Sequence, residues 1–384
     1  MHAGAAIVWL GLGWWLMSLI VHCATAALAR RPRAHGASVN TKRAPADFSI
    51  VAPLAGASDA SAGYIHSLKA LSDAGAEVLI CVADAEDGAV APLRALWPEA
   101  PLLVGSDSTF NPKMNNVRKG FERAGRPVVV LCDAGTILDV DLLCRAAAPL
   151  SPRVGLVLAL KAGEAPESFA AELERAYING HQARFLFAAD RLGLAVASGG
   201  VTFLANDTLQ RIGNWRGFNR WIADDYSVTR SVRELGLTTR LGTVMPPLPL
   251  GRREWNAVWR RQVRWARTRL RLPVWPLVLW EPMIGWFVSG LAGLLGLAAM
   301  GGGAALLTAG LLFHTALWLA AEKWFMAGRG LAFGPRASAA ALLREALAPV
   351  LMVTALSGRT IDWRGTDLGG QWRMRGDDPP ESVV

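Results

Sequence analysis

The residues whose types and spacing most directly suggest chemistry are an acidic pair, Asp224 and Asp225, and a basic pair further along the chain, Arg261 and Arg264. The acids open a segment with apolar residues at helical spacing, and a carboxylate at a helix N-terminus is held ionised by the backbone dipole. Such a carboxylate can act as a general base. The arginines lie three positions apart, so they share a helix face and could neutralise phosphates. The pattern indicates group transfer from an activated phosphate donor. The alternative is a helix-capping acid and a basic surface helix that binds lipid headgroups.

Further acids follow predicted strands. Asp84 and Asp87 come after the apolar run Glu77–Ala83, where a carboxylate can accept hydrogen bonds from a nucleobase or a ribose. Asp133 comes directly after Val128–Cys132, at an edge where a hard divalent cation that bridges a diphosphate needs oxygen ligands. Each acid alone could be a turn residue. Their repetition at successive strand ends or helix starts favours a binding site.

Two other polar side chains, Lys113 and His181, have both a functional and a structural interpretation. Lys113 follows Asn111 and Pro112 at a predicted helix start and could reach donor phosphates as a point charge. The alternative is a capped helix start with a solvated lysine. His181 lies in a predicted helix without an HxxE or HExxH pattern for zinc, so a structural role is expected for it.

The elements that must position these residues alternate between strand-like and helical patterns from Phe48 to Thr243. This alternation predicts an α/β domain with a mostly parallel sheet and helices on both faces, which binds ligands at the carboxyl ends of its strands. Glu164–Ala189 is predicted to be one long helix. The predicted strands are Phe48–Pro53, Glu77–Ala83, Leu102–Gly105, Val128–Cys132, Val154–Leu160, Val201–Leu204 and Thr238–Val244.

The composition indicates a membrane partner. Hydrophobic residues make up 52% of the 384 residues and the mean hydropathy is +0.27, which is high for a purely soluble protein. The net charge of +9 comes from arginines beside apolar segments, which favours lipid headgroups or phosphates over nucleic acid. Ala5–Ala29 is uncharged, has membrane-spanning length and lacks a cleavage site, so it predicts an N-terminal transmembrane anchor. The cations that follow it place the next segment in the cytoplasm, namely Arg30, Arg31, Arg33, Lys42 and Arg43.

The C-terminal part is also apolar. Gly251–Leu272 contains eight arginines among tryptophans and predicts an interfacial amphipathic helix. The apolar runs Val274–Met300 and Ala304–Ala321 predict a membrane hairpin. A third run, Ala337–Leu356, contains charged residues. A full crossing there would put the arginine-rich tail outside, so a re-entrant or interfacial segment is favoured.

The motifs occur in an order that resembles membrane-bound glycosyltransferases of family two and, more specifically, the ceramide glucosyltransferase family, family twenty-one. That family includes bacterial members that glycosylate hopanoids. The similarity runs from about Phe48 to Arg375. The motifs are Ile80-Cys-Val-Ala-Asp84-Ala-Glu-Asp87, Asn111-Pro-Lys-Met-Asn-Asn116, Cys132-Asp-Ala-Gly135, Asp224-Asp-Tyr226, Arg261-x-x-Arg264-Trp265 and Thr360-Ile-Asp-Trp-Arg364.

The resemblance implies a GT-A domain that uses a UDP-sugar and Mg²⁺ or Mn²⁺, with inversion at the anomeric carbon. It implies that Asp225 is the base and that Asp133 holds the metal and diphosphate. The nucleotide-sugar contacts would come from Asp84, Asp87, Lys113, Asp133, Arg261 and Arg264. Asp224 and Trp265 would belong to the acceptor side. Asp224 stands where the family usually has Glu, Gly88 stands where it often has Pro, and a match at His181 needs a shift of one residue.

We therefore expect a multi-pass protein of a bacterial inner membrane that moves a hexose of the Glc or GlcNAc type from a UDP-sugar to the hydroxyl of a ceramide or hopanoid. One alternative is a processive family-two polysaccharide synthase, which would need more spanning helices. Another is a non-catalytic lipid-binding membrane protein, which would release no UDP. The expected parts are an anchor (1–30), a cytoplasmic GT-A domain (46–250), the interfacial helix with the RxxRW motif (251–272), the membrane hairpin with the third apolar segment (274–357) and a cytoplasmic basic tail (358–384).

Overall fold

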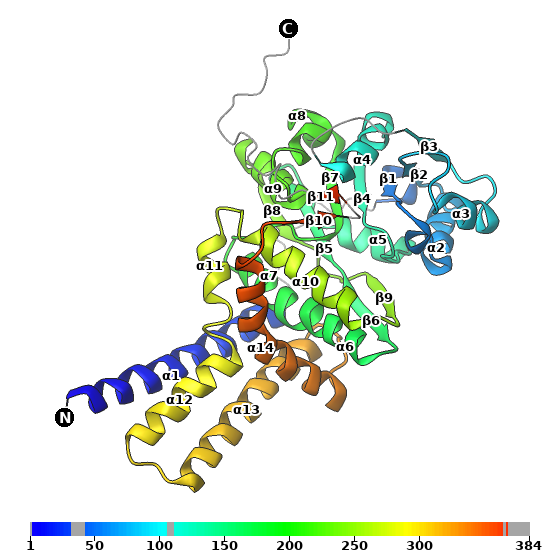
Figure 1. The fold of residues 1–384 in the computed structure, drawn as a ribbon. Coiled ribbons are helices and arrows are strands. Elements are labelled where there is room, and N and C mark those ends of the chain that lie inside the picture. The colour runs from blue at the N-terminus through cyan, green and yellow to red at the C-terminus, as the bar shows by residue number, and fades with distance from the viewer. Residues whose placement is uncertain (1, 32–42, 106–110, 364–365, 368–384) are drawn as a thin grey trace. The chain divides into compact units, whose positions relative to one another are not determined.

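The computed structural model describes residues 2–31, 43–105, 111–363 and 366–367 (Figure 1). They fall into two compact units. Of the described residues, the helical unit comprises 2–31, Ala165–Arg191 and 250–363 with 366–367, and the sheet unit comprises 43–105, 111–164 and Leu192–Pro249. The cations predicted at Arg33 and Lys42 lie outside the described residues, as does most of the predicted tail 358–384.

The sheet unit is built on one seven-stranded sheet in the order β3-β2-β1-β4-β7-β5-β8. Only β7 runs antiparallel to its neighbours in this sheet, so the predicted mostly parallel arrangement is confirmed. Its strands are β1 (Phe48–Pro53), β2 (Glu77–Val82), β3 (Leu102–Val104), β4 (Val128–Cys132), β5 (Val154–Leu160), β7 (Gly200–Ala205) and β8 (Thr238–Leu241). A separate two-stranded sheet pairs β6 (Ala162–Pro166) with β9 (Pro247–Gly251).

Helices cover both faces of the large sheet. Successive strand residues point to opposite faces. Ile50 packs in a core with Ile65 of α2 (Ala62–Asp73), Leu93 of α3 (Val90–Leu96) and Leu143 of α5 (Val140–Ala147). The next side chain, Val51, faces the other way and lies against α4 (Pro112–Arg123). That second face also carries α9 (Asp224–Glu234), which packs on β5 and β8.

The strand directions fix where a ligand site can form. Cys132 at the end of β4 pairs with Val201, and Leu160 at the end of β5 pairs with Gly200. The carboxyl ends of β4 and β5 therefore flank the start of β7. Residues that follow β4 and β5 and residues that precede β7 meet at this edge, where open α/β sheets bind ligands.

The helical unit contains a helix that departs from its predicted bounds. The predicted helix Glu164–Ala189 instead begins at Phe169, because Pro166 disfavours helical backbone at Ala165 and Ser168 caps the first turn. It runs through α6 (Phe169–Arg175), a π-helical segment η3 (Ala176–Gln182) and α7 (Ala183–Arg191).

Among the described residues of this unit, three helices are long and apolar enough to cross a membrane: Ala5–Arg30 within α1 (His2–Arg30), α13 (Ala304–Ala327) and α14 (Pro335–Leu356). The predicted run Val274–Met300 is not one helix. It divides into α11 (Trp275–Trp280) and α12 (Trp286–Ala299), because Pro282 and the charged Glu281 interrupt it. The third run forms a continuous helix of spanning length, and its favoured re-entrant placement stays a prediction.

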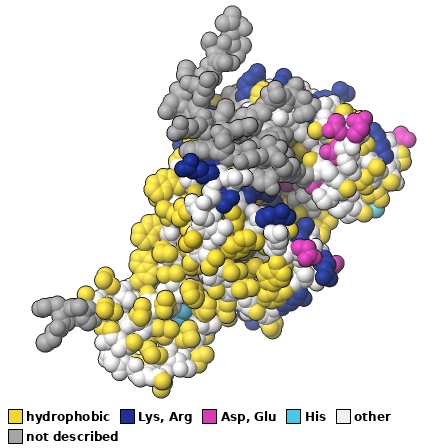
Figure 2. Space-filling model, in the orientation of Figure 1, with side chains coloured by type: hydrophobic (Ala, Val, Ile, Leu, Met, Phe, Trp, Pro, Cys, Tyr) yellow, Lys and Arg dark blue, Asp and Glu magenta, His cyan; other side chains and the backbone are white. Residues whose placement is uncertain are grey.

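The surface of the helical unit is apolar, as expected for helices that contact a membrane. Hydrophobic side chains gather over α11, α12 and α13 on the face shown in Figure 2. The exposed apolar side chains of these three helices include Leu277, Leu291, Leu295, Leu312 and Phe313, each at least 45% exposed. Exposed apolar area of this kind marks a surface that lipid or another apolar partner covers.

Candidate functional site

A lysine held between two aspartates forms the centre of the candidate site. The Nζ atom of Lys113 lies 2.9 Å from Oδ1 of Asp133 and 2.6 Å from Oδ2 of Asp224. The three side chains are between 19 and 22% exposed. Burial alone would lower the pKa of Lys113, but the two carboxylates raise it above its ordinary value, so the amine stays charged. The structure thus brings together three of the predicted site residues.

The start of α4 places this lysine. Asn111 caps the helix, with its side-chain oxygen accepting a hydrogen bond from the Lys113 backbone N–H at 3.0 Å, and Pro112 occupies the first helical position. The Asn111 side-chain amide donates to the Ile222 carbonyl at 3.3 Å, shortly before α9 begins. The Asn-Pro-Lys motif therefore ties the start of one helix to the segment that carries Asp224.

Asp133 is held by the loop that opens β7. Its Oδ2 atom accepts from the Gly200 backbone N–H at 3.1 Å. Gly200 has a φ of +147°, and a Cβ atom there would lie 2.4 Å from the Ala159 carbonyl oxygen, so no other residue fits. Burial opposes ionisation of Asp133, but the positive charges of Lys113 and Lys161 lower its pKa below the ordinary value. Asp133 is therefore a stable carboxylate at the predicted edge.

Lys161 is a residue that sequence reasoning missed. It directly follows β5, and its charge acts on Asp133. The signal was available, because the strand Val154–Leu160 was predicted and a cation at its carboxyl end lies where the acids were placed. With Lys113, it gives this edge two cations that can face an anionic ligand.

Asp225 has the properties of a base near neutrality. Its Oδ2 atom accepts from the Gly199 backbone N–H at 2.8 Å, and its Oδ1 atom accepts from the Tyr226 N–H at 2.8 Å. Burial, and then the negative charge of Asp224, raise the pKa of Asp225 to about 7. A carboxylate with this pKa takes up a proton more readily than an ordinary aspartate and is still largely ionised above pH 7. Because Gly199 and Gly200 are adjacent, Asp225 and Asp133 are fixed by one short loop.

The acids after β2 are arranged differently. The Oδ1 atom of Asp87 accepts from the backbone N–H groups of Gly56 and Ala89, both at 2.8 Å. Asp84 is exposed. Asp87 therefore joins the loops that follow β1 and β2, whereas Lys113 joins Asp133 and Asp224. The predicted contact of Asp84 and Asp87 with a nucleotide stays a prediction.

The basic motif lies on α10 (Trp255–Arg269) of the helical unit. Arg261 forms an ion pair with Glu174 of α6, whose side chain is 2% exposed. Arg264 and Trp265 are half-buried, and the apolar face of α10 packs against α6 and α14. Within its own unit Arg261 is thus anchored by a buried carboxylate. Convergence of the motif with the acids of the sheet unit stays a prediction.

The site suits a divalent cation only with help from a ligand. Within the described residues, no group of three or more His, Cys, Asp or Glu side chains could hold a metal ion. Asp133 and Asp224 nevertheless already hold one positive charge between them, the Lys113 ammonium. Mg²⁺ in proteins is commonly bound by one or two carboxylates, with substrate phosphates and water completing its shell. The carboxylates of Asp133 and Asp224 therefore fit a divalent cation that arrives with a diphosphate.

The relatives found by sequence carry names that describe enzymes acting on a lipid. The chain is 25% identical over 312 residues to ceramide glucosyltransferase 1 of Caenorhabditis elegans, covering 78% of this chain and 66% of that protein. It is also 25% identical over 337 residues to ceramide glucosyltransferase 3 of the same organism, covering 84% of this chain and 72% of that protein. The chain thus spans just under two thirds of the length of the first of these relatives.

A solved structure shows the fold. The mannosyltransferase PcManGT from Pyrobaculum calidifontis, in complex with GDP-Man and Mn²⁺, superposes with a TM-score of 0.50 at 16% identity. The superposition covers 91% of this chain and 97% of that one. The predicted GT-A fold is confirmed by this likeness together with the sheet order. The family model for glycosyl transferase family 21 matches residues 13–375, and the chain therefore belongs to glycosyltransferase family 21.

Proposed function

We propose that this chain transfers a hexose from a UDP-sugar to a hydroxyl group of a membrane lipid, at the cytoplasmic face of a bacterial inner membrane. The observation that carries the proposal is the placement of Asp225, with a pKa near 7, beside the cation-bridged pair of Asp133 and Asp224. The names of the sequence relatives support a lipid acceptor, and three helices of spanning length support a membrane setting.

In the proposed reaction Asp225 takes the proton from the acceptor hydroxyl. The hydroxyl oxygen forms a bond to the anomeric carbon from the face opposite the diphosphate. The bond between that carbon and the diphosphate oxygen breaks, and its electron pair leaves with UDP, so the anomeric configuration inverts. We assign Asp84 and Asp87 to the nucleotide and Lys113 and Lys161 to the anionic end of the donor.

The leaving diphosphate gains charge as its bond breaks. A divalent cation held by Asp133 and the donor's own phosphates would neutralise part of that charge. We assign Arg261 and Arg264 to the same diphosphate, because guanidinium groups bind phosphate oxygens in a bidentate manner, and Trp265 to the acceptor side. These residues would stabilise the leaving group while Asp225 activates the hydroxyl.

A pH profile tests the assignment of Asp225. A base works only when it is deprotonated, so kcat/KM should rise through about pH 7 and be about tenfold lower at pH 6 than on its plateau. Asp224→Asn removes a negative charge that raises the pKa of Asp225, and the midpoint should move to lower pH. The measurement is the rate of UDP release at lipid acceptor concentrations well below its KM. A flat profile from pH 5.5 to pH 8.5 in both proteins would remove Asp225 as the base.

A glutamine in place of Glu174 tests the anchoring of Arg261. With its buried carboxylate partner gone, the Arg261 guanidinium loses its fixed position, so KM for the UDP-sugar should rise by about tenfold with a smaller change in kcat. Glu172→Gln is the matched control, because Glu172 is equally buried on the same helix but pairs with Arg175 at 2.5 Å. Equal KM values in the two variants would show that Arg261 needs no anchor or does not bind donor.

A further inference from the structure

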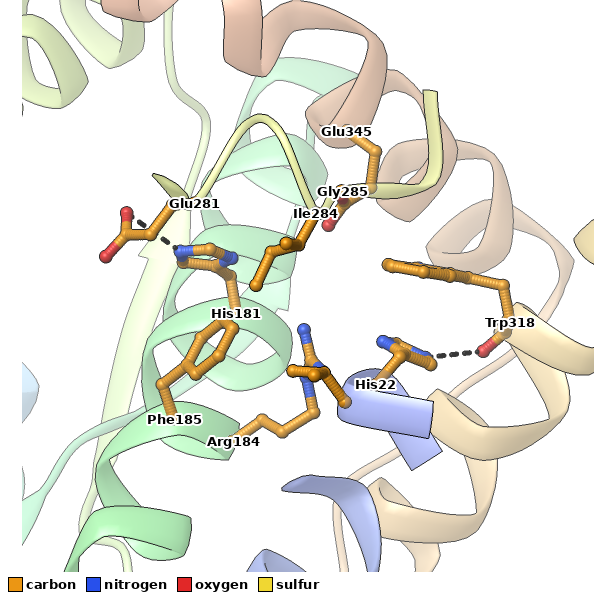
Figure 3. Close-up of a pocket in the computed structure, with 10 residues that line it drawn as sticks. His22, His181, Arg184, Phe185, Glu281, Ile284, Gly285, Trp318 and Glu345 are labelled. Carbon is orange, nitrogen blue, oxygen red and sulfur yellow. Dashed lines mark hydrogen bonds and ion pairs between the residues drawn. The ribbon is translucent and has the colours of Figure 1, made fainter. Parts of the chain in front are cut away.

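The helical unit contains a pocket that is lined entirely by its own residues. It is bounded by α1, η3, α7, α13, α14 and the turn between α11 and α12. Figure 3 shows Arg184 reaching from α7 toward His22 of α1, with His181 and Glu281 on one side and Trp318 of α13 on the other. The rings of His22 and Trp318 stack with their centroids 3.7 Å apart. Val21 and Ile284 add apolar wall.

Three lining side chains bury polar atoms without a partner. His22, Arg184 and Trp318 are 1 to 2% exposed. Within the described part of the chain, the Nδ1 atom of His22, the Nε atom of Arg184 and the Nε1 atom of Trp318 have no hydrogen-bond partner. Each such atom costs free energy when buried, so three in one pocket are unusual for a purely structural cluster. The Arg184 and Trp318 atoms carry N–H groups, so a group that binds to them presents accepting oxygens.

The charges around the pocket cancel. The cations are Arg184, Arg269 and Arg344, and the anions are Glu281, Glu322 and Glu345. Arg269 pairs with Glu281 at 2.6 Å, and Arg344 pairs with Glu322 and Glu345 at 2.8 and 2.7 Å. These three arginines and three glutamates together carry no net charge. A pocket of this kind favours an uncharged polar group over a phosphate, which would need a net positive site.

We propose that this pocket binds the uncharged, oxygen-bearing polar group of a membrane lipid, such as a hydroxyl or an amide carbonyl at the end of an apolar chain. The inference rests on the proposed function for its setting in a membrane. The N–H groups of Arg184 and Trp318 donate to the lipid oxygens, and the apolar walls contact the adjoining carbons. The lipid is either the acceptor on its way to glycosylation or a bilayer lipid that is not glycosylated, and these two sources share the same chemistry.

Photolabelling of the full chain in detergent–lipid micelles tests the proposal. The probe is a ceramide with a diazirine near its amide, and the comparison is a diazirine-bearing phosphatidic acid. We expect the ceramide probe to label peptides of α1, α7 and α13 around His22, Arg184 and Trp318, and unlabelled ceramide to compete. Trp318→Phe keeps the ring but removes the N–H, and labelling should fall about fivefold. Trp324→Phe, on the exposed side of the same helix, is the matched control and should leave labelling unchanged.

Arg184→Lys is a second test variant of the pocket, because it keeps the positive charge while removing the Nε–H group. A rise in KM for the lipid acceptor in both pocket variants, with KM for the donor unchanged, identifies the bound lipid as the acceptor. Lower labelling with an unchanged acceptor KM identifies a bilayer lipid. Equal labelling of Trp318→Phe and Trp324→Phe, or preferential labelling by phosphatidic acid, overturns the proposal. Labelling needs no sugar donor, so loss of the proposed transferase activity and loss of this site are separate results.

Discussion

Asp225→Asn is expected to lower sugar transfer by about 10²- to 10⁴-fold, since general base catalysis contributes an acceleration of that size. Asparagine keeps the shape of the side chain and can still accept from the Gly199 N–H, but it cannot take the proton of the acceptor hydroxyl. The measurement is transfer from a radiolabelled UDP-sugar to a lipid acceptor at pH 8, where the native carboxylate is ionised. Binding of UDP should stay within a few-fold of the native value.

The same variant should remain folded. The pKa of Asp225 in the folded protein is raised above its unfolded value. The stability it contributes is therefore fully present below the unfolded pKa and is lost as pH rises through about 7. At pH 8 asparagine removes an unfavourable buried charge, so the thermal midpoint should be equal or higher. Asp207→Asn, at an exposed position in the first turn of the short helix Asn206–Arg211, is the control for amide substitution and should keep full activity. Near-native turnover of Asp225→Asn would assign the base to another residue.

Asp133→Asn is expected to have the next largest effect, a loss of about 100-fold or more, together with weaker binding of a divalent cation. Asp133 faces Lys113, Lys161 and the Gly200 N–H, so its loss leaves a cationic edge without its carboxylate. In the native protein, EDTA should stop transfer and Mg²⁺ or Mn²⁺ should restore it. The variant should need a higher cation concentration for half of its residual rate.

A separate experiment could contradict the assignment of a divalent cation to the site. Full activity of the native protein in EDTA would show that side-chain cations such as Lys113, which bridges Asp133 and Asp224, supply the positive charge without a metal ion. Lys113→Met distinguishes the cases. If a divalent cation is used, added Mn²⁺ should recover part of the activity of this variant. If Lys113 acts alone, it should not.

The places of Asp133 and Asp225 on the elements of the fold could be predicted from the sequence, whereas their roles stay predictions. Asp133 comes after an apolar run that is a buried strand, and Asp225 comes at the start of an amphipathic helix, so both patterns are local. The approach of strand ends in a parallel sheet then brings these acids to one edge. The mostly parallel sheet and the apolar helices follow from the same local patterns.

The partners of the cations could not be predicted in this way. The Nζ atom of Lys113 lies on Asp133 and Asp224, which are distant in sequence, and its predicted contact with donor phosphates stays a prediction. Arg261 was likewise assigned to a diphosphate, and its carboxylate partner is Glu174, which carried no motif. A long flexible side chain takes whichever anion the tertiary structure brings near it, and residue spacing does not encode that choice.

Breaks within helical stretches were also beyond the sequence pattern. The π-helical segment Ala176–Gln182 lies inside a stretch that the sequence pattern predicts as ordinary helix, because a change to i→i+5 hydrogen bonds leaves the composition unchanged. The break at residues 281–285 had a visible signal in Pro282, but the apolar residues on both sides outweighed it. Glu281 there is paired with Arg269 and His181, contacts that only the folded helical unit reveals.

The central claim is transfer of one sugar to a lipid by the carboxylates of the sheet unit. Mass spectrometry of lipid extracts tests it most directly, in matched cells that carry either the native chain or Asp225→Asn at equal membrane abundance. We predict a lipid carrying a single hexose in the cells with the native chain and its absence in the cells with the variant. Identical lipid profiles would contradict the claim, as would a native product that is a sugar polymer rather than a glycolipid.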